Sequence, residues 1–431
     1  MRLSRRRFLA GAAVLAAAGS VPTWMISRRR GSLEDQRPEH VILVDWDGFD
    51  PAYLDRAPTP NLDALTELGS ISAARSTYPT ISNSARASMS TGAYPEVHGN
   101  LAYYLDRETG KALGENRSLA AETVMETLAE AGKTVASVQW YMVQDHGVAF
   151  GDPRHLYVEP GGLFGARVDA AINILEGSPV DSVGGTSKVP KVPDFLAVYG
   201  SDLDDLGHAE GPDGPNIGPL LSEMDRQLGR LVQATKDAGI DRRTAFIVTG
   251  DHGMTGWKKN LTPSLLDRIS SAGYAPEVVT SGGSPKPSTE VVLITGSVRT
   301  VTIALRGQTT TDRGRRKITA AVEAAPHVAK VLGTAELADL SAGYGSDVLV
   351  AEAEEPWGFL SPGESAGAAR GAHGSTREMP VPLLLSGAGI RQNSAPRDPR
   401  LVDVAPTVCA LLGTRPPKDA QGRVLQEALG I

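Results

Sequence analysis

Short apolar runs recur along the chain, and longer stretches with a helical pattern separate most of them. These runs are rich in β-branched residues and apolar at most positions, which is typical of strands buried on both faces of a sheet. We expect strands at residues 40–44, 134–139, 194–199, 244–249 and 381–386. Such runs are too short to cross a membrane, so they predict the interior of a folded domain.

Three segments near these runs have the features of helices. Segment 59–69 has Pro60 at its first turn, segment 82–91 stops before Gly92, and segment 119–132 is amphipathic. Strands that alternate with helices indicate an α/β fold in which a mostly parallel central sheet carries helices on both faces.

Residues from about 258 to 345 follow a different pattern. Two strands at 291–295 and 301–305 could pair with each other, and a helix is expected at 318–325. We interpret this segment as a small α+β insertion within one domain that covers 38–431.

The N-terminal residues 1–30 have the pattern of an export signal. The motif Ser4-Arg5-Arg6-Arg7-Phe8-Leu9 precedes the apolar run 10–18, and no acidic residue occurs before Glu34. Paired arginines ahead of Phe-Leu indicate twin-arginine export, which carries folded proteins. An extracellular, periplasmic or cell-surface location is expected, and the apolar stretch up to Ile26 could stay as an anchor.

Charge and cysteine content narrow the choice of chemistry. The seven arginines of residues 1–30 leave 36 basic against 50 acidic residues in the rest of the chain. An acidic surface repels nucleic-acid phosphates, so a nucleic-acid scaffold role is disfavoured. Cys409 is the one cysteine. A disulfide and a thiolate metal cluster are therefore excluded, and any metal must be held by His, Asp and Glu.

Side chains that commonly bind metals stand where the predicted strands meet their loops. In wound α/β sheets, ligands bind beyond the carboxyl ends of the strands. The candidate ligands are Asp47, Asp204, His208, Asp251, His252 and His373. Each residue alone also fits a turn or a solvated loop, but the set as a whole favours a metal centre. Imidazole with carboxylate suits zinc, with manganese and iron as competitors.

Ser82 is the candidate nucleophile. It would begin the helix at 82–91, and the N–H groups and dipole of a helix N-terminus favour an anion. A hydroxyl there could bind a metal, lose its proton and attack phosphorus. The position also suits a serine that only caps the helix. Asn83, Arg86 and Tyr104 are candidates for substrate contacts, although Arg86 also fits a solvent-facing helix position.

These motifs, in this order, resemble the alkaline phosphatase superfamily, and within it the nucleotide pyrophosphatase/phosphodiesterase branch. The resemblance spans about 40–425 and is thin over 258–345. The motifs that carry it are Asp47-Gly48, Pro79-Thr80-x-Ser82, Tyr94-Pro95-Glu96-x-His98-Gly99, Asp204-x-x-Gly207-His208, Asp251-His252-Gly253-Met254 and His373-Gly374. The resemblance implies an alkaline-phosphatase-like three-layer sandwich with the small insertion.

The resemblance also implies a hydrolase with two divalent metal ions, most simply zinc. One ion would be held by Asp204, His208 and His373. The other would be held by Asp47, Asp251 and His252. Ser82 would form a phosphoryl-enzyme intermediate, and the substrate would be a small phosphate diester or a nucleotide with a pyrophosphate bond.

Three departures from the branch keep other substrates open. The branch usually has threonine at the position of Ser82 and a Pro-Asn pair where this chain has Ser84 and Ala85. Arg86 falls where sulfatases and phosphonate monoester hydrolases carry an arginine. A phosphate monoester, a phosphonate monoester or a sulfate ester is therefore an alternative substrate. A further alternative is an exported binding protein that has lost turnover.

Overall fold

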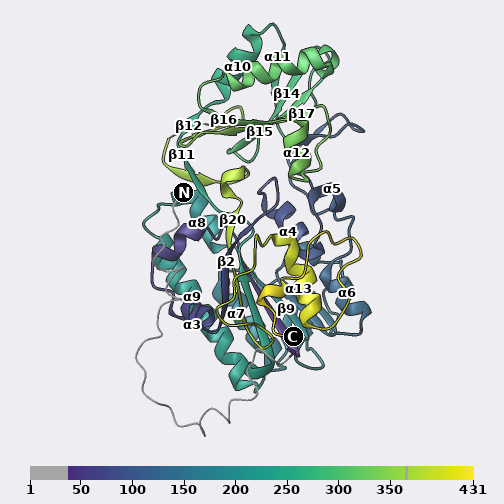
Figure 1. The fold of residues 1–431 in the computed structure, drawn as a ribbon, viewed down its shortest axis with the longest axis vertical. Coiled ribbons are helices and arrows are strands. Elements are labelled where there is room, and N and C mark those ends of the chain that lie inside the picture. The colour runs from purple at the N-terminus through teal and green to yellow at the C-terminus, as the bar shows by residue number, and fades with distance from the viewer. Residues whose placement is uncertain (1–36, 365–366) are drawn as a thin grey trace.

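A seven-stranded sheet forms the centre of the molecule in a computed structural model that describes residues 37–364 and 367–431 (Figure 1). Its strands are β1 (His40–Trp46), β2 (Gly69–Arg75), β5 (Val135–Val138), β6 (His155–Val158), β9 (Phe195–Gly200), β10 (Thr244–Thr249) and β20 (Pro380–Gly387). Their order across the sheet is β2-β20-β10-β1-β9-β5-β6. The five strands from β10 to β6 run parallel, and β20 is antiparallel to both of its neighbours. The predicted mostly parallel sheet is therefore confirmed.

Helices cover both faces of this sheet. The helices α3 (Pro60–Glu67), α7 (Phe164–Leu175) and α9 (Ile217–Asp237) pack on one face, and the helices α4 (Ser82–Thr91), α6 (Val124–Glu130) and α13 (Val404–Leu411) pack on the other. Side chains of β1 alternate between the two cores: Ile42 and Val44 face the first, and Val41 and Leu43 face the second. This double coverage explains why the strands are apolar throughout, and the three-layer α/β sandwich is confirmed.

Two strands of the sheet and some helix limits differ from the sequence-based expectation. Strands β2 and β6 were not predicted, because β2 mixes polar with apolar residues and β6 has only four residues. The helix expected at 119–132 begins only at Val124, since Thr123 caps it: the hydroxyl of Thr123 accepts the Glu126 N–H, and the Glu126 carboxylate accepts the Thr123 N–H.

A second sheet lies at one end of the molecule, at the top of Figure 1. Its strands are β13 (Pro276–Val279), β14 (Val291–Ile294), β15 (Thr300–Leu305), β16 (Val328–Leu332) and β17 (Val348–Ala353), in the order β13-β14-β15-β17-β16. Helices α10 (Thr262–Ser271) and α11 (Asp312–Glu323) pack on it, and α12 (Thr334–Asp339) lies nearby. The strands expected at 291–295 and 301–305 pair antiparallel as β14 and β15. Strand β17 belongs to this sheet but lies beyond residue 345, the expected end of the insertion. The limits of the insertion stay a prediction.

Short two-stranded ribbons connect the two sheets. Strand β11 (Thr255–Trp257) pairs antiparallel with β19 (Arg370–Ala372), and β12 (Lys259–Asn260) pairs with β18 (Trp357–Gly358). The chain therefore leaves the central domain and returns to it side by side. The remaining α-helices and strands are α5 (Pro95–His98), β3 (Tyr104–Leu105), β4 (Ala112–Leu113), β7 (Val180–Ser182), β8 (Gly185–Ser187) and α8 (Asp202–Glu210).

The N-terminal export motif lies outside the described residues. Within 37–364 and 367–431, none of the helices combines the length and apolar composition that a membrane crossing requires.

Candidate metal centre and nucleophile

The carboxyl ends of three adjacent strands bring the predicted ligands together. Asp47 follows β1, and Asp251 and His252 follow β10, its parallel neighbour. Helix α8 begins two residues after β9, the other neighbour of β1, and it carries Asp204 and His208. The sixth ligand, His373, directly follows β19. Because β19 pairs with β11, which lies shortly after His252 in the sequence, His373 comes close to His252.

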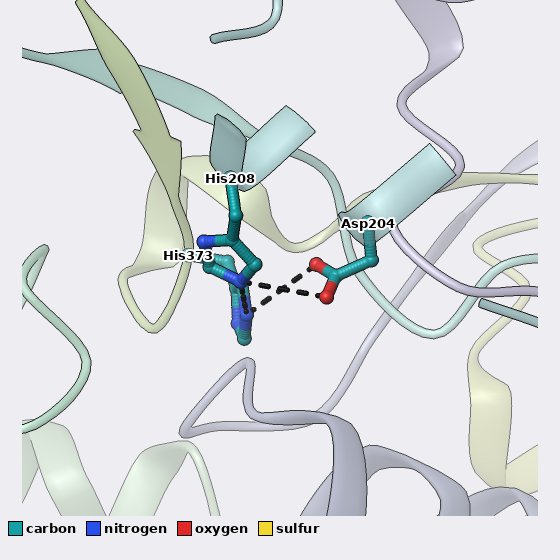
Figure 2. A group of neighbouring side chains, drawn as sticks. All are labelled: Asp204, His208 and His373. Atoms are coloured by element: carbon teal, nitrogen blue, oxygen red, sulfur yellow. Dashed lines mark hydrogen bonds and ion pairs between the residues drawn. The ribbon is translucent and has the colours of Figure 1, made fainter. Parts of the chain in front are cut away.

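Asp204, His208 and His373 form the first group (Figure 2). Asp204 and His208 are four residues apart in α8, so both project from the same face of that helix. The Nε2 atom of His208 lies 3.4 Å from Asp204 Oδ2 and 3.2 Å from His373 Nε2. His373 Nε2 lies 3.6 Å from Asp204 Oδ1. The three side chains therefore converge on one point.

Asp47, Asp251 and His252 form the second group, and all three are buried. His252 Nε2 lies 3.3 Å from Asp47 Oδ1 and 3.3 Å from Asp251 Oδ2. The second group adjoins the first, because the rings of His252 and His373 stack with their centroids 3.6 Å apart. Two ions held by these groups would be close neighbours.

Backbone carbonyl groups fix the orientation of all three imidazole rings. In each ring Nδ1 bonds to a carbonyl oxygen, so Nε2 is left to face the ligand group. The partners are Gly371 O for His208 at 3.0 Å, Gly253 O for His252 at 3.0 Å and Thr80 O for His373 at 2.7 Å. Thr80 lies two residues before Ser82, so the segment that precedes the serine also orients His373.

The donor atoms suit divalent metal ions. Asp204 Oδ1 and Asp251 Oδ2 are buried and accept no hydrogen bond from the described residues. Burial and the nearby Asp47 carboxylate raise the pKa of Asp204 well above its usual value. Burial and the neighbouring His373 hold the pKa of His252 well below its usual value, so its ring is neutral, as a metal ligand must be. Each group thus offers three protein ligands, the number that catalytic zinc sites use.

Ser82 lies directly against the second group. Its Oγ atom is 3.0 Å from His252 Nε2 and 3.5 Å from Asp47 Oδ1. Ser82 is the first residue of α4, and Ile81 occupies the N-cap position with no side-chain cap. The Ser82 hydroxyl is therefore turned toward the ligand group and does not cap the helix.

Arg86 does not lie where a substrate contact was expected. Its side chain is 0% exposed. Its Nε donates to Asp45 Oδ2 at 2.7 Å, and its Nη2 lies 2.8 Å from Asp47 Oδ2 and 3.1 Å from Asp251 Oδ2. Burial would raise the pKa of Asp47, but the Arg86 guanidinium lowers it below its usual value. Arg86 is thus a buried cation that contacts the carboxylates of the second group.

Sequence reasoning missed several residues that support Asp47. Tyr199 donates a 2.6 Å hydrogen bond to Asp47 Oδ2, and the guanidinium groups of Arg86 and Arg167 both contact the Tyr199 ring. Asp45 also accepts a 3.0 Å hydrogen bond from the indole N–H of Trp140. The pair Asp45-x-Asp47 was visible in the sequence, but nothing local to Tyr199 or Trp140 marks them as neighbours of a metal ligand.

The two other candidates for substrate contacts, Asn83 and Tyr104, pair with residues outside this centre. The Asn83 side chain donates to the carbonyl oxygen of Asn116 at 2.8 Å. Tyr104 pairs with Leu113 in the hairpin of β3 and β4. Neither makes a hydrogen bond or ion pair to Ser82 or to the six ligands in the described part of the chain.

Comparison with known proteins agrees with this architecture. Human ectonucleotide pyrophosphatase/phosphodiesterase family member 5 is 27% identical over 241 residues, which are 50% of this chain and 45% of the relative. The bis(5'-adenosyl)-triphosphatase enpp4 of Xenopus laevis is 28% identical over 244 residues, 54% of this chain and 51% of the relative. The chain therefore spans about half the length of the curated relatives it matches.

Solved structures and a family profile extend the comparison over most of the chain. The structure of human ectonucleotide pyrophosphatase/phosphodiesterase 5 superposes with a TM-score of 0.65 at 21% identity, over 88% of this chain and 96% of that one. A murine counterpart, solved as an inactive variant in complex with AMP, has a TM-score of 0.66 at 21% identity over 88% of this chain and 96% of that one. The profile of the type I phosphodiesterase/nucleotide pyrophosphatase family matches residues 41–375. The chain belongs to this family.

Proposed function

We propose that this protein is a metal-dependent hydrolase of phosphate diesters or nucleotide pyrophosphate bonds, with Ser82 as the nucleophile. The observation that carries the proposal is the position of the Ser82 hydroxyl, 3.0 Å from His252 Nε2 and beside two adjoining three-ligand groups. An oxygen nucleophile next to paired metal sites suits an in-line displacement at phosphorus, because two ions can stabilise the attacking and the leaving oxygens.

Each group would hold one divalent ion, most simply zinc, with manganese or iron as alternatives. The two ions would supply positive charge that lowers the pKa of the nucleophile and neutralises the phosphoryl and leaving oxygens. Ser82 Oγ would release its proton to solvent and bond to phosphorus, while the bond from phosphorus to the leaving oxygen breaks and its electron pair stays on that oxygen. Water would then cleave the serine ester, release the phosphoryl product and return a proton to Ser82.

A small nucleotide is the substrate class that we favour. One relative is an ectonucleotide pyrophosphatase/phosphodiesterase by name, another is a bis(5'-adenosyl)-triphosphatase, and one structural neighbour holds AMP. One of the three sequence departures behind the monoester, phosphonate and sulfate alternatives was an arginine that could bind a substrate oxyanion. Because Arg86 is buried against three carboxylates, that reason for them is lost.

Removal of metal is expected to abolish hydrolysis of bis(p-nitrophenyl) phosphate, because both groups lose the charge that activates Ser82. Dialysis against a chelator followed by titration with zinc, manganese or iron tests this, with metal content measured on the same samples. Activity should return as the metal content approaches two ions per chain.

A substrate panel on the zinc-loaded protein compares the hydrolysis rates of a phosphate diester, a phosphate monoester and a sulfate ester. The diester should be hydrolysed faster than p-nitrophenyl phosphate and p-nitrophenyl sulfate. A protein that binds less than one ion per chain, or that prefers the sulfate ester by orders of magnitude, would contradict the proposal.

We also infer that residues 1–30 direct export through the twin-arginine route, which suits a protein that acquires metal while folding in the cytoplasm. Changing Arg5 and Arg6 to lysine is expected to hold the protein inside the cell, because this route reads the arginine pair. Cell fractionation followed by immunoblotting measures the exported share. The same change at Arg28 and Arg29 is the control and should leave export intact; equal export of both variants would contradict the inference.

A further inference from the structure

Arg117 is an exposed cation on the segment that follows β4. It forms no ion pair with any residue in 37–364 or 367–431, although the body of the protein is acidic. Many of the other exposed arginines pair with a carboxylate, as Arg226 does with Glu223. An unpaired guanidinium on an acidic protein is free to bind an anion from solution.

Hydrogen bonds fix this segment next to the nucleophile. The carbonyl oxygen of Asn116 accepts a 2.8 Å bond from the side chain of Asn83 and a 3.0 Å bond from that of Asn100. The side chain of Asn116 in turn donates to Leu101 O at 3.0 Å. Asn83 directly follows Ser82, so the backbone that carries Arg117 is tied to the start of α4.

The Arg117 side chain is also placed by an aromatic ring that contacts the metal-ligand network. The Cζ atom of Arg117 lies 4.7 Å from the centroid of Tyr141, within the range of a cation–π interaction. The Tyr141 hydroxyl accepts a 2.7 Å hydrogen bond from Arg86 Nη1, and Arg86 Nη2 lies 2.8 Å from Asp47. An unbroken series of contacts thus joins the exposed guanidinium to a ligand of the second group.

The chemistry of a guanidinium restricts what it would recognise there. Arginine binds phosphate through two parallel N–H donors, a geometry that lysine cannot reproduce. The phosphoryl group under attack would be held by Ser82 and the two ligand groups. In a nucleoside polyphosphate the remaining negative charge is on the leaving group. An additional cation placed there can discriminate between substrates whose leaving group has a phosphate and substrates whose leaving group has none.

We propose that Arg117 determines substrate specificity by binding a phosphate of the leaving group. The preferred substrate class is then the nucleotide with a pyrophosphate linkage, in preference to a diester whose leaving group has no phosphate. This inference rests on the proposed function and deepens it.

Two thymidine nucleotides with the same transferred group test the proposal. Thymidine triphosphate has pyrophosphate as its leaving group, and the p-nitrophenyl ester of thymidine 5'-monophosphate has p-nitrophenolate. In Arg117→Ala, kcat/KM for the triphosphate is expected to fall at least about tenfold more than kcat/KM for the ester, through KM, because a charge-assisted hydrogen bond is lost. Arg117→Lys should recover part of this loss, since lysine keeps the charge without the paired donors.

Lys111→Ala is the matched control, because Lys111 is also exposed and lies six residues earlier in the same hairpin region. It should leave the ratio of the two kcat/KM values unchanged. If the ratio of the two kcat/KM values in Arg117→Ala equals that of wild type, whether or not both values fall, the proposed role of Arg117 is overturned while the hydrolase proposal stands. A zinc-loaded wild-type protein that hydrolyses neither substrate would overturn both.

Discussion

Ser82→Ala is expected to lower kcat for bis(p-nitrophenyl) phosphate at least about 1,000-fold while the protein still binds its metal ions. The variant removes the Oγ atom that lies 3.0 Å from His252 Nε2 and leaves all six ligands in place. Only direct attack by water would remain, without the covalent step that divides the reaction into two easier ones. Steady-state kinetics and metal analysis on the same preparation measure the two quantities.

Two further variants separate loss of the nucleophile from damage to the helix. Ser84→Ala removes another hydroxyl of α4, which donates to Asn100 O and touches no ligand. The kcat of this variant should therefore stay within a few-fold of wild type. Ser82→Thr should retain turnover, because threonine supplies the same oxygen. Mass spectrometry of the acid-quenched wild type should find the transferred group on Ser82. Full turnover by Ser82→Ala would remove the serine from the mechanism.

Arg86→Met is expected to destabilise the metal-free protein by about 3 to 5 kcal/mol, because it leaves buried carboxylates without their cation. Arg86 is 0% exposed and lies within 3.1 Å of a carboxylate oxygen of Asp45, Asp47 and Asp251. Metal should restore part of the stability, since a divalent ion bound to Asp47 and Asp251 replaces part of the lost charge. The metal-loaded variant should also lose about 10- to 100-fold in kcat, because Asp47 and Asp251 lose the group that orients them.

Denaturant unfolding with and without zinc measures both effects on stability. The double variant Asp45→Asn with Arg86→Met is the matched control: it removes one buried charge of each sign and should be more stable than Arg86→Met alone. If Arg86→Met unfolds at the same denaturant concentration as wild type in the absence of metal, Arg86 does not compensate these carboxylates.

The central fold was accessible from the sequence because strands buried on both faces leave a strong signal. The runs at 40–44 and 244–249 became β1 and β10 with nearly the predicted limits. Since β1, β9 and β10 are parallel neighbours, Asp47, Asp204 and Asp251 reach the same edge of the sheet. Strands β2 and β6 were missed because β2 has a mixed composition and β6 is too short to show such a signal.

The misplacement of Arg86 has a definite cause. Every residue of α4 from Ser84 to Thr91 is buried, so this helix has no solvent-facing side in the structure. A short helix with many small polar residues suggests an exposed face, and only its burial between the sheet and the surrounding loops shows that Arg86 points inward. Asp45, its ion-pair partner, was indistinguishable from an ordinary polar interruption near the end of a strand.

The sequence by itself determined the parallel sheet, the helices on its two faces and the kinds of side chain available at its carboxyl edge, because these follow from local patterns of apolar and polar residues. The family resemblance already implied that His373 joins Asp204 across the insertion, but only the tertiary structure decided that Arg86 lies beneath the second group and that Arg117 lies on Tyr141. Such contacts join residues that are distant along the chain, and the direction of a side chain there depends on what packs against each face of its segment, which no local pattern records.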